Sequence, residues 1–243
     1  MQRYFVENMG KDEFIIGKED HHHIKKVMRM KNGEEIICIN EKKEIYLCQI
    51  EDIELGKIKV LSLLDQDCEL PVSVTLIYAL PKSDKFEFVL QKATELGVNC
   101  IVPLKTRRSI IKTDRKTFHK KYGRFNKILK EAAEQSYRNH IPKICELIDL
   151  KEVKEYLGMH NIVAYEEKAK ENELSLFKQV LSNVHIGDTI TIIVGCEGGF
   201  DEDEIELLEQ MGVQACSLGK RILRSETAPL YMLSSISYAV ELK

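Results

Sequence analysis

The first 70 residues carry short runs in which apolar and β-branched residues alternate with polar ones. A period of two is typical of strands that bury one face. Turn-forming pairs such as Asn32-Gly33 separate these runs. The pattern predicts strands over residues 14–16, 35–40, 45–51 and 57–64, and a helix over 21–30. We therefore expect a small β-barrel or sheet at the amino end.

The pattern changes after Leu70-Pro71, where we place a domain boundary that divides the chain into residues 1–71 and 72–243. Beyond it, buried apolar runs alternate with segments of helical periodicity, which is typical of an α/β domain with a largely parallel sheet. The expected strands cover 74–80, 101–104, 161–165, 189–194 and 214–218. The expected helices cover 83 or 84 to 96, 122–139, 201–211 and 228–242.

Two of these helices carry further signals. Asp201 and Glu204 have the spacing of an amino-terminal capping box. The last helix, 228–242, has almost no polar face, which predicts burial on all sides. A domain of this size can provide that burial with a second subunit, so we expect a homodimer that uses this helix.

Composition excludes several classes of protein. The chain has 243 residues, 44% of them hydrophobic and 31% charged, which fits neither a disordered chain nor a small disulfide-stapled module. The apolar runs are far shorter than the roughly 20 residues that span a bilayer, so we expect no membrane contact. The amino terminus lacks the pattern of a secretory signal, and we expect a cytoplasmic protein.

Cysteine and histidine give no metal site. The seven cysteines are scattered without a C-x-x-C pair, which indicates reduced thiols that mostly act as small buried hydrophobes. His21, His22 and His23 are consecutive, and three consecutive ring side chains cannot all face one ion. An exposed polar turn is the better interpretation, and we assign no metal.

The formal net charge is only −3, but the charges are unevenly distributed. Between Lys105 and Lys130 there are eleven Lys and Arg residues against one acid, Asp114, a local net charge of +10. The acids that compensate lie elsewhere, notably over 201–209. Such a basic stretch suits contacts with phosphates, the alternative being a solvated helix face with no partner.

A glycine cluster, residues 195–200, follows the strand predicted over 189–194. Glycines at this position let a ligand approach the backbone, and the amides of the following helix favour a polar or anionic group. The spacing matches neither the dinucleotide fingerprint nor a P-loop. Cys196 lacks the glycine two residues earlier that a nucleophile elbow needs, because Val194 occupies that position. A purely structural loop remains the alternative, in which Glu197 would bind a neighbouring amide rather than a ligand.

A second cluster, residues 218–229, follows the strand predicted over 214–218. It combines the apolar pair Ile222 and Leu223 with Arg224 and Glu226, ahead of a helix whose first turn contains Pro229. Neighbouring loops at the carboxyl ends of parallel strands usually form the ligand crevice of an open α/β sheet. An apolar shelf with backbone donors would suit an adenine ring.

These segments together resemble the bacterial 16S ribosomal RNA uridine-N3 methyltransferases, the RsmE family of the SPOUT class. The resemblance covers essentially the whole chain. Its most specific motifs are IIVGCEGGF and LGKRILRSETAPL, in this order before a final apolar helix, although the family usually has proline at the position of Cys196. Other matching segments are MQRYFV, HHHIKKVMRMKNGEEI, LPKSDKFEFVLQKATELGV and KEAAEQSYRNHIP.

The resemblance implies an amino-terminal PUA-like β-barrel and a SPOUT-like carboxy-terminal α/β domain with a trefoil knot. It further implies a homodimer that binds S-adenosylmethionine and methylates N3 of one uridine, uracil 1498, in the 16S ribosomal RNA of the small subunit. The residues that it assigns to the cofactor are Val194, Gly195, Glu197, Gly198, Gly199, Leu218, Gly219, Ile222, Leu223, Thr227 and Ala228.

Neutral uracil carries a proton on N3, so methyl transfer needs a group that removes this proton or stabilises the anion while water takes it. We expect Arg224 to stabilise the anion and Glu226 to orient Arg224 or accept the proton. An Arg224–Glu226 ion pair that only shapes the loop is the alternative.

RNA contacts are expected from two regions. Gln135, Arg138 and Asn139 share one face of the basic helix and would read a flipped uridine or nearby phosphates. Arg107 and Arg108 are the phosphate candidates, and Arg3 and Arg29 in the barrel are expected as auxiliary RNA contacts. Two other functions stay open from the residues alone, a SPOUT methyltransferase with another RNA target and a non-catalytic RNA-binding factor for ribosome assembly.

Overall fold

The computed structural model describes residues 1–8, 13–82, 85–111, 113–170 and 175–242. It divides the chain into two compact units, each described by itself. The amino-terminal unit is Met1–Glu69 with Ala133–His140, and the carboxy-terminal unit is Leu70–Ala132 with Ile141–Lys243. This division falls two residues before the boundary predicted from sequence. It also places residues 133–140 with the amino-terminal strands, although the prediction gives them to the second domain.

The amino-terminal unit is built on a six-stranded sheet of order β1-β4-β5-β6-β3-β2. Its strands are β1 (Arg3–Phe5), β2 (Glu7–Asn8), β3 (Glu13–Ile15), β4 (Glu35–Ile39), β5 (Ile45–Asp52) and β6 (Lys57–Leu64). One face of this sheet, which includes Ile36 and Ile50, packs against Ile24 of the helical segment. In β4 the other face is buried too, because Ile37 and Ile39 form a second cluster with Ile45. That segment comprises α1 (Lys18–His22) and a π-helical turn, η1 (His23–Val27), and so begins three residues before the predicted helix.

A parallel sheet of order β10-β8-β7-β12-β11-β13, with β9 beside β8, forms the centre of the carboxy-terminal unit. The strands are β7 (Ser73–Ala79), β8 (Cys100–Lys105), β9 (Lys143–Ile144), β10 (Ile148–Asp149), β11 (His160–Ala164), β12 (Thr189–Val194) and β13 (Gln214–Cys216). The helices are α2 (Lys85–Glu95), α3 (Arg115–His119), α4 (Tyr122–Gln135), η2 (Leu150–Tyr156), α5 (Glu167–Lys170), α6 (Leu176–Ser182), α7 (Glu202–Gln210) and α8 (Thr227–Glu241).

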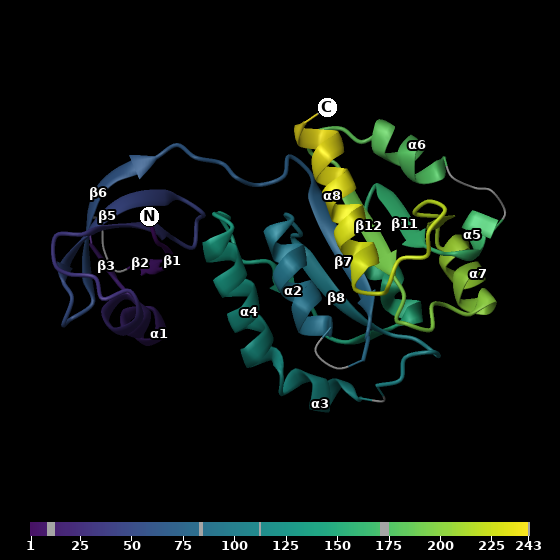
Figure 1. The fold of residues 1–243 in the computed structure, drawn as a ribbon, viewed down its shortest axis with the longest axis horizontal. Coiled ribbons are helices and arrows are strands. Elements are labelled where there is room, and N and C mark those ends of the chain that lie inside the picture. Colours follow the sequence, from purple (N-terminus) through teal and green to yellow (C-terminus); the bar gives the residue numbers. More distant parts are fainter. Residues whose placement is uncertain (9–12, 83–84, 112, 171–174, 243) are drawn as a thin grey trace. The chain divides into compact units, whose positions relative to one another are not determined.

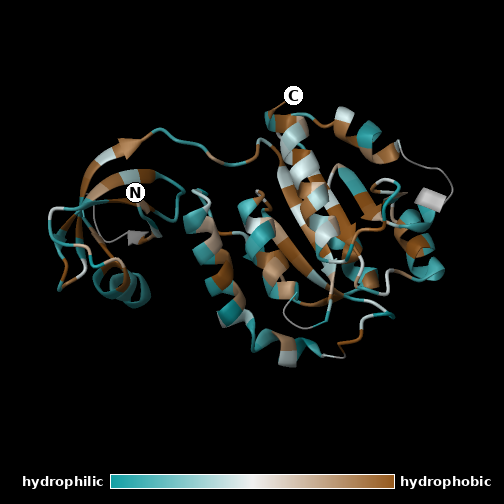
Figure 2. Ribbon diagram, in the orientation of Figure 1, coloured by the Kyte–Doolittle hydropathy of each residue, from teal (hydrophilic) through white to brown (hydrophobic). Residues whose placement is uncertain are grey.

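Helices cover both faces of this sheet (Figure 1). Leu76 and Tyr78 of β7 belong to a core that includes residues of α2, α4, α6 and α8. Ile77, between them, points to the opposite core, where Val153 of η2 and Leu208 of α7 pack. Burial on both faces explains why the central strands are mostly apolar, as the brown stretches of Figure 2 show, although β7 and β12 each carry a threonine in their interior.

Where the local sequence signal for a helix end is strong, the structure contains the predicted helix end. The capping box of α7 is present, because Asp201 and Glu204 each bind the other's backbone N–H. Gly97 follows α2 with a φ of 91°, a value that favours glycine. The predicted cap at Ser83 or Asp84 lies outside the described residues. Helix α4 ends at Gln135, four residues earlier than predicted, and Tyr137 beyond it has a φ of 63°.

Within a single chain, the last helix is buried on one side only. Met232, Leu233 and Ile236 of α8 are buried, but Tyr238 is 63% exposed and Tyr231 is also exposed. The sheet therefore covers only part of the apolar surface of α8, and the rest is exposed. Of the helices in the described ranges, none has the length and apolar character that a membrane crossing requires.

Candidate cofactor and active site

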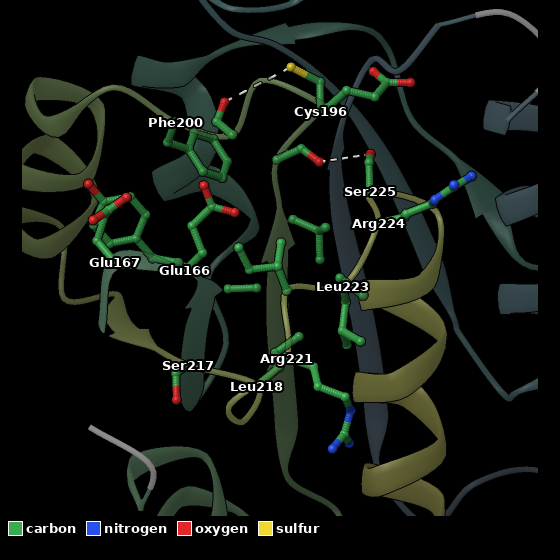
Figure 3. Close-up of a pocket in the computed structure, with 18 of the residues that line it drawn as sticks. Glu166, Glu167, Cys196, Phe200, Ser217, Leu218, Arg221, Leu223, Arg224 and Ser225 are labelled. Carbon is green, nitrogen blue, oxygen red and sulfur yellow. Dashed lines mark hydrogen bonds between the residues drawn. The ribbon is translucent and has the colours of Figure 1, made fainter. Parts of the chain in front are cut away.

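A cavity of about 480 Å³ lies at the carboxyl ends of β11, β12 and β13. Its walls come from the segments that follow these strands and from the start of α2. Figure 3 shows Glu166 and Glu167 on one side, and Leu223, Arg224 and Ser225 on the other. This is the position at which parallel α/β sheets bind ligands.

The glycine loop after β12 folds back on itself. Gly199 N–H donates to the carbonyl of Cys196 over 2.9 Å, and the φ of Gly199 is 66°. A Cβ on Gly195 would lie 3.1 Å from Gly199 Cα and 3.2 Å from Phe200 Cε2. A Cβ on Gly198 would lie 3.0 Å from Arg108 Cβ. The glycines are therefore required by the close packing of the loop itself.

Ser225 connects the glycine loop to the loop that follows β13. Its buried hydroxyl donates to the carbonyl of Gly195 over 3.0 Å and lies 2.9 Å from the hydroxyl of Tyr78. Burial raises the pKa of Tyr78, so this phenol stays protonated and can donate to Ser225. Cys196 is buried beside Thr106, with 3.9 Å between Sγ and Oγ1. This environment supports a structural role for Cys196.

Lys85, the first residue of α2, joins the same two loops by charge. Its Nζ lies 3.0 Å from Glu197 Oε1 and 2.9 Å from Glu226 Oε2. Burial would raise the pKa of both carboxyls, but hydrogen bonds from Lys85 and from backbone N–H groups outweigh burial and lower the pKa of each. The two carboxylates in turn raise the pKa of Lys85. All three groups are therefore charged at neutral pH.

This arrangement revises the role predicted for Glu226. The sequence left open an ion pair between Glu226 and Arg224, whereas the ion pair of Glu226 in the structure is with Lys85. A carboxylate whose pKa is lowered is a weak base, so Glu226 does not fit the predicted role of proton acceptor. Arg224 lines the cavity with an exposed side chain, where it can meet an incoming anion.

The chemistry of the cavity wall changes from apolar to charged. Leu218, Ile222 and Leu223 form the apolar part, and Ile222 is 75% exposed although it is hydrophobic. Glu166 and Arg221 contribute opposite charges elsewhere on the wall. A ligand with a flat apolar ring and a zwitterionic end would find a partner for each part, and the volume suits a small molecule of cofactor size.

Most residues predicted for the cofactor come together here. Those that line the cavity are Val194, Gly195, Glu197, Gly199, Leu218, Gly219, Ile222, Leu223 and Ala228. Gly198 and Thr227 lie outside this lining set. Lys85 and residues 164–167 also line the cavity, and neither was predicted from the sequence. The signal for the latter was available, because the strand predicted over 161–165 also ends at the ligand edge of the sheet.

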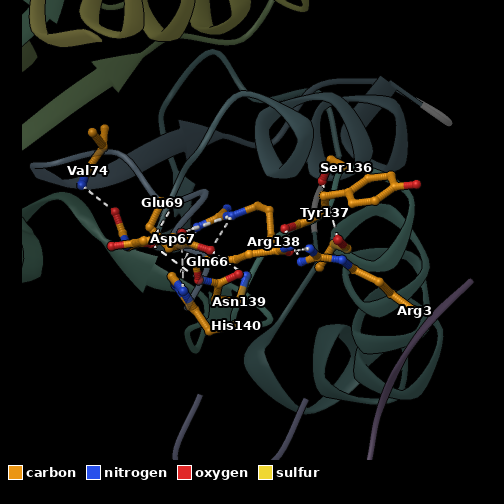
Figure 4. A network of polar contacts seen from close by, with 12 residues as sticks. Arg3, Gln66, Asp67, Glu69, Val74, Ser136, Tyr137, Arg138, Asn139 and His140 are labelled. Atoms are coloured by element: carbon orange, nitrogen blue, oxygen red, sulfur yellow. Dashed lines mark hydrogen bonds and ion pairs between the residues drawn. The ribbon is translucent and has the colours of Figure 1, made fainter. Parts of the chain in front are cut away.

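Three predicted RNA contacts do not fit the structure. Arg138 is only 2% exposed, and its guanidinium is held by Glu69, with 2.5 Å between Nη2 and Oε2 (Figure 4). Arg3 is buried, donates to the carbonyl of Tyr137 over 2.6 Å and stacks on the Tyr137 ring. Asn139 is buried and donates to the carbonyl of Gln66 over 3.1 Å. Because their donors are used inside the amino-terminal unit, these residues attach residues 133–140 to it.

The other RNA candidates are on the surface. Arg29 and Gln135 are exposed. Arg107 and Arg108 are exposed too, but they form ion pairs with Asp203 over 2.8 Å and with Asp201 over 2.5 Å. The acids of α7 therefore partly neutralise the start of the basic stretch, which the sequence analysis treated as separate from them.

The exposed polar turn predicted at His21, His22 and His23 is wrong, because these residues belong to α1 and η1. Two of the three have partners within the amino-terminal unit. His21 Nε2 lies 2.5 Å from the carbonyl of Ile53, and His23 Nδ1 lies 3.0 Å from the hydroxyl of Tyr4. Across the ranges that the structure describes, three or more His, Cys, Asp or Glu side chains nowhere gather as a metal would require.

Comparison with known proteins assigns both parts of the chain. Residues 68–237 match the family described as RNA methyltransferase domain, and residues 15–61 match the RNA methyltransferase PUA domain. Fold and site therefore define an RNA methyltransferase with an amino-terminal PUA domain. The predicted fold class is confirmed at this level.

Relatives narrow the assignment. The chain is 40% identical to ribosomal RNA small subunit methyltransferase E of Bacillus subtilis, over 100% of this chain and 98% of that protein. It is 36% identical to the protein of that name from Mesomycoplasma hyopneumoniae, over 96% and 98%. The crystal structure of the Neisseria gonorrhoeae enzyme bound to S-adenosyl methionine superposes with a TM-score of 0.82 at 28% identity, covering 98% of this chain and 97% of that one. The chain belongs to the ribosomal RNA small subunit methyltransferase E family, which confirms the resemblance found in its motifs.

Proposed function

We propose that this protein transfers a methyl group from S-adenosylmethionine to N3 of a specific uridine in the 16S ribosomal RNA of the small subunit. The observation that carries the proposal is the cavity formed by the two loops after β12 and β13. It belongs to a chain of the methyltransferase E family, and a relative with the same fold binds S-adenosyl methionine. An RNA modifier of this kind would act in the cytoplasm.

The residues of the cavity fit the proposed cofactor. The apolar side chains of Leu218 and Leu223 would enclose the adenine ring, and the backbone of the glycine loop would approach the ligand closely. Glu166 and Arg221 have the charges that the amino and carboxylate groups of the methionine part require. When bound, S-adenosylmethionine supplies an electrophilic methyl group on its sulfonium.

Arg224 is the residue proposed to stabilise the uracil anion. Its side chain is exposed at the cavity wall, whereas Lys85 is already shared between two carboxylates. Glu226 pairs with Lys85 and so connects the loop that contains Arg224 to the start of α2. Because the pKa of Glu226 is lowered, the N3 proton leaves to water while the Arg224 guanidinium stabilises the charge.

Substrate binding is assigned to exposed basic and polar residues. The proposed contacts are Arg29 in the amino-terminal unit and Gln135 at the end of α4, with Arg107 and Arg108 at phosphates. The last two must exchange their acidic partners for phosphate oxygens, which have a similar geometry. The target uridine must leave its stack, because a base pair hides N3.

We also propose a trefoil knot in the carboxy-terminal unit and a homodimer. The chain returns from β13, at the edge of the sheet beyond β11, to α8, which contacts β12 and α2. This return path, over residues 217–226, supports a trefoil knot. The exposed aromatic residues on α8 support a homodimer through this helix.

One experiment tests the proposed cofactor, the substrate and the methylated product together. Purified protein is incubated with methyl-labelled S-adenosylmethionine and small ribosomal subunits from cells that lack the enzyme, and the labelled nucleoside is identified after digestion. We expect 3-methyluridine at a single position, which primer extension locates. A different methylated nucleoside would overturn the target, and failure to bind the cofactor would overturn the site.

A further inference from the structure

Two cysteines that the cofactor site does not use lie side by side in the carboxy-terminal unit. Cys100 opens β8, and Cys145 directly follows β9, which pairs with β8 in parallel. Cys100 is in register with Lys143, so alternation places Cys145 on the same face of the sheet. The distance between the two sulfur atoms is 3.1 Å. The position is fixed by the backbone, because Cys145 N–H donates to the carbonyl of Ile101 over 2.9 Å.

This separation is short enough for a bond to form with little movement. A disulfide has an S–S distance of about 2.05 Å, so the sulfurs need to approach by roughly 1 Å. Cys145 is buried, with 7% of its surface exposed, whereas Cys100 is partly exposed, so access for a small oxidant is on the side of Cys100. The hydroxyl of Tyr122 donates to the carbonyl of Cys145 over 2.7 Å and holds this segment in place.

The surroundings also favour a thiolate. A hydrogen bond from Cys100, together with the charge of Lys143, lowers the pKa of Cys145. The same interaction, with burial, raises the pKa of Cys100. The contact between the two sulfurs therefore favours one thiolate beside one protonated thiol.

We propose that Cys100 and Cys145 form an oxidation site at which hydrogen peroxide produces a reversible intramolecular disulfide. The Cys145 thiolate attacks one peroxide oxygen, the O–O bond breaks, and hydroxide leaves as Cys145 becomes a sulfenic acid. Hydroxide takes the proton of Cys100, whose thiolate then attacks the Cys145 sulfur. The S–O bond breaks, and the second hydroxide takes up the proton that Cys145 had lost. Two thiols are oxidised by two electrons, and one peroxide is reduced to two waters.

The amino-terminal unit contains a natural comparison. Cys38 and Cys48 lie on the paired strands β4 and β5, but both are 0% exposed. A hydrogen bond with Cys48, together with burial, raises the pKa of Cys38. Because an oxidant cannot reach Cys38 and Cys48 and the pKa of Cys38 is raised, this second pair should stay reduced. Cys68 is exposed and distinct from both pairs, so it reports on unselective oxidation.

The proposed disulfide should leave cofactor binding intact, because neither cysteine lines the cavity. It would connect the start of β8 to the end of β9 and so close the loop of chain that contains the whole basic stretch. Oxidised protein should therefore bind S-adenosylmethionine within twofold of the reduced protein.

The experiment uses the full chain with Cys68→Ser, treated with hydrogen peroxide at neutral pH and digested under conditions that preserve disulfides. We expect one linked peptide pair that contains Cys100 and Cys145, reversal by dithiothreitol, and intact thiols at Cys38 and Cys48. In the Cys100→Ser variant the sulfenic acid has no partner, so dimedone should label Cys145. In Cys145→Ser, labelling of Cys100 should be at least tenfold lower.

The proposal is overturned if the linked peptide is absent at a peroxide dose that oxidises Cys68 in the unsubstituted chain. It is also overturned if Cys100 or Cys145 proceeds to sulfinic acid without linkage. These readouts use the Cys68→Ser chain and do not depend on the folding of the other variants. Cofactor binding before oxidation shows that this chain is folded.

Discussion

At the scale of single residues, Lys85 should matter as much as the glycines of the cofactor loop. Replacing it by Met keeps the length of the side chain and leaves Glu197 and Glu226 facing each other without a shared cation. Removing one partner of a partly buried charge cluster strongly destabilises the charges that remain. We expect Lys85→Met to weaken cofactor binding about tenfold, which corresponds to about 1.4 kcal/mol, measured by isothermal titration calorimetry.

Lys82 provides a matched control for this change. Its backbone N–H lies 3.2 Å from Glu197, but its side chain is exposed. Lys82→Met should therefore bind the cofactor normally. Loss of Lys85 should also raise the pKa values of Glu197 and Glu226, which moves the acidic limit of the binding profile to higher pH. An unchanged pH profile in Lys85→Met would contradict the positioning role of this lysine.

The glycine loop gives a second prediction at this scale. An Ala at Gly195 would bring its Cβ within 3.1 Å of backbone at Gly199, and backbone atoms cannot yield as a flexible side chain can. We expect Gly195→Ala to weaken cofactor binding more than tenfold. Gly123 in α4 has open space around its Cβ position, so Gly123→Ala should bind normally and stabilise the helix by about 0.5–1 kcal/mol. Calorimetry and thermal unfolding of both variants test the contrast.

At the scale of elements, the Arg138–Glu69 pair attaches residues 133–140 to the amino-terminal unit. Both side chains are nearly buried, and Glu69 also accepts from the N–H of Asn139 over 2.7 Å. Arg138→Met leaves the Glu69 carboxylate buried without its main partner, which typically costs about 3 kcal/mol. Urea unfolding should show this loss, whereas Arg29→Met, at an exposed position, should change stability by less than about 0.5 kcal/mol.

The same pair predicts a dependence of stability on pH. Burial would raise the pKa of Glu69, but hydrogen bonds from His140 and Arg138 outweigh it and lower this pKa to about 2. A lowered carboxyl pKa stabilises the fold fully above the unfolded value near 4.5, and the contribution disappears as the pH falls through about 2. The difference in stability between wild type and Glu69→Gln should therefore be largest above pH 5 and shrink toward pH 2.

Elements with a strong local signal were predictable, and tertiary pairings were not. An apolar run predicts strand β12, and the spacing of Asp201 and Glu204 predicts the start of helix α7. Both signals involve residues only a few positions apart. The role of Lys85 depends on carboxylates more than 100 positions away. Periodicity placed Arg138 on a helix face, but α4 ends before it, and Glu69 then decides its environment.

At the scale of the whole molecule, the exposed apolar part of α8 predicts self-association. Tyr238 is 63% exposed and Tyr231 is 42% exposed, and Leu242, directly after the helix, is 74% exposed. This is a large apolar surface for a helix that packs on a sheet. Light scattering should give about twice the chain mass of 28.0 kDa at micromolar concentration. Tyr238→Glu should shift the mass to that of one chain, while Glu41→Lys, at an exposed turn of the amino-terminal unit, should not. A single-chain mass for the wild type would contradict the homodimer.

Binding to the small subunit should depend on salt in a way that separates two groups of basic residues. Lys120 and Lys121 are exposed between α3 and α4, whereas Arg107 and Arg108 already pair with acids of the α7 region. A lysine that releases counterions from a phosphate contributes about one to the slope of log affinity against log salt. Lys120→Ala with Lys121→Ala should therefore reduce the slope by about two. Arg107→Ala with Arg108→Ala should reduce it by less than one, because each arginine must first leave a carboxylate.

Filter binding to subunits from cells that lack the enzyme, at several salt concentrations, measures both slopes. Equal reductions would mean that RNA displaces the α7 acids at no cost, and that the basic stretch binds as one continuous surface.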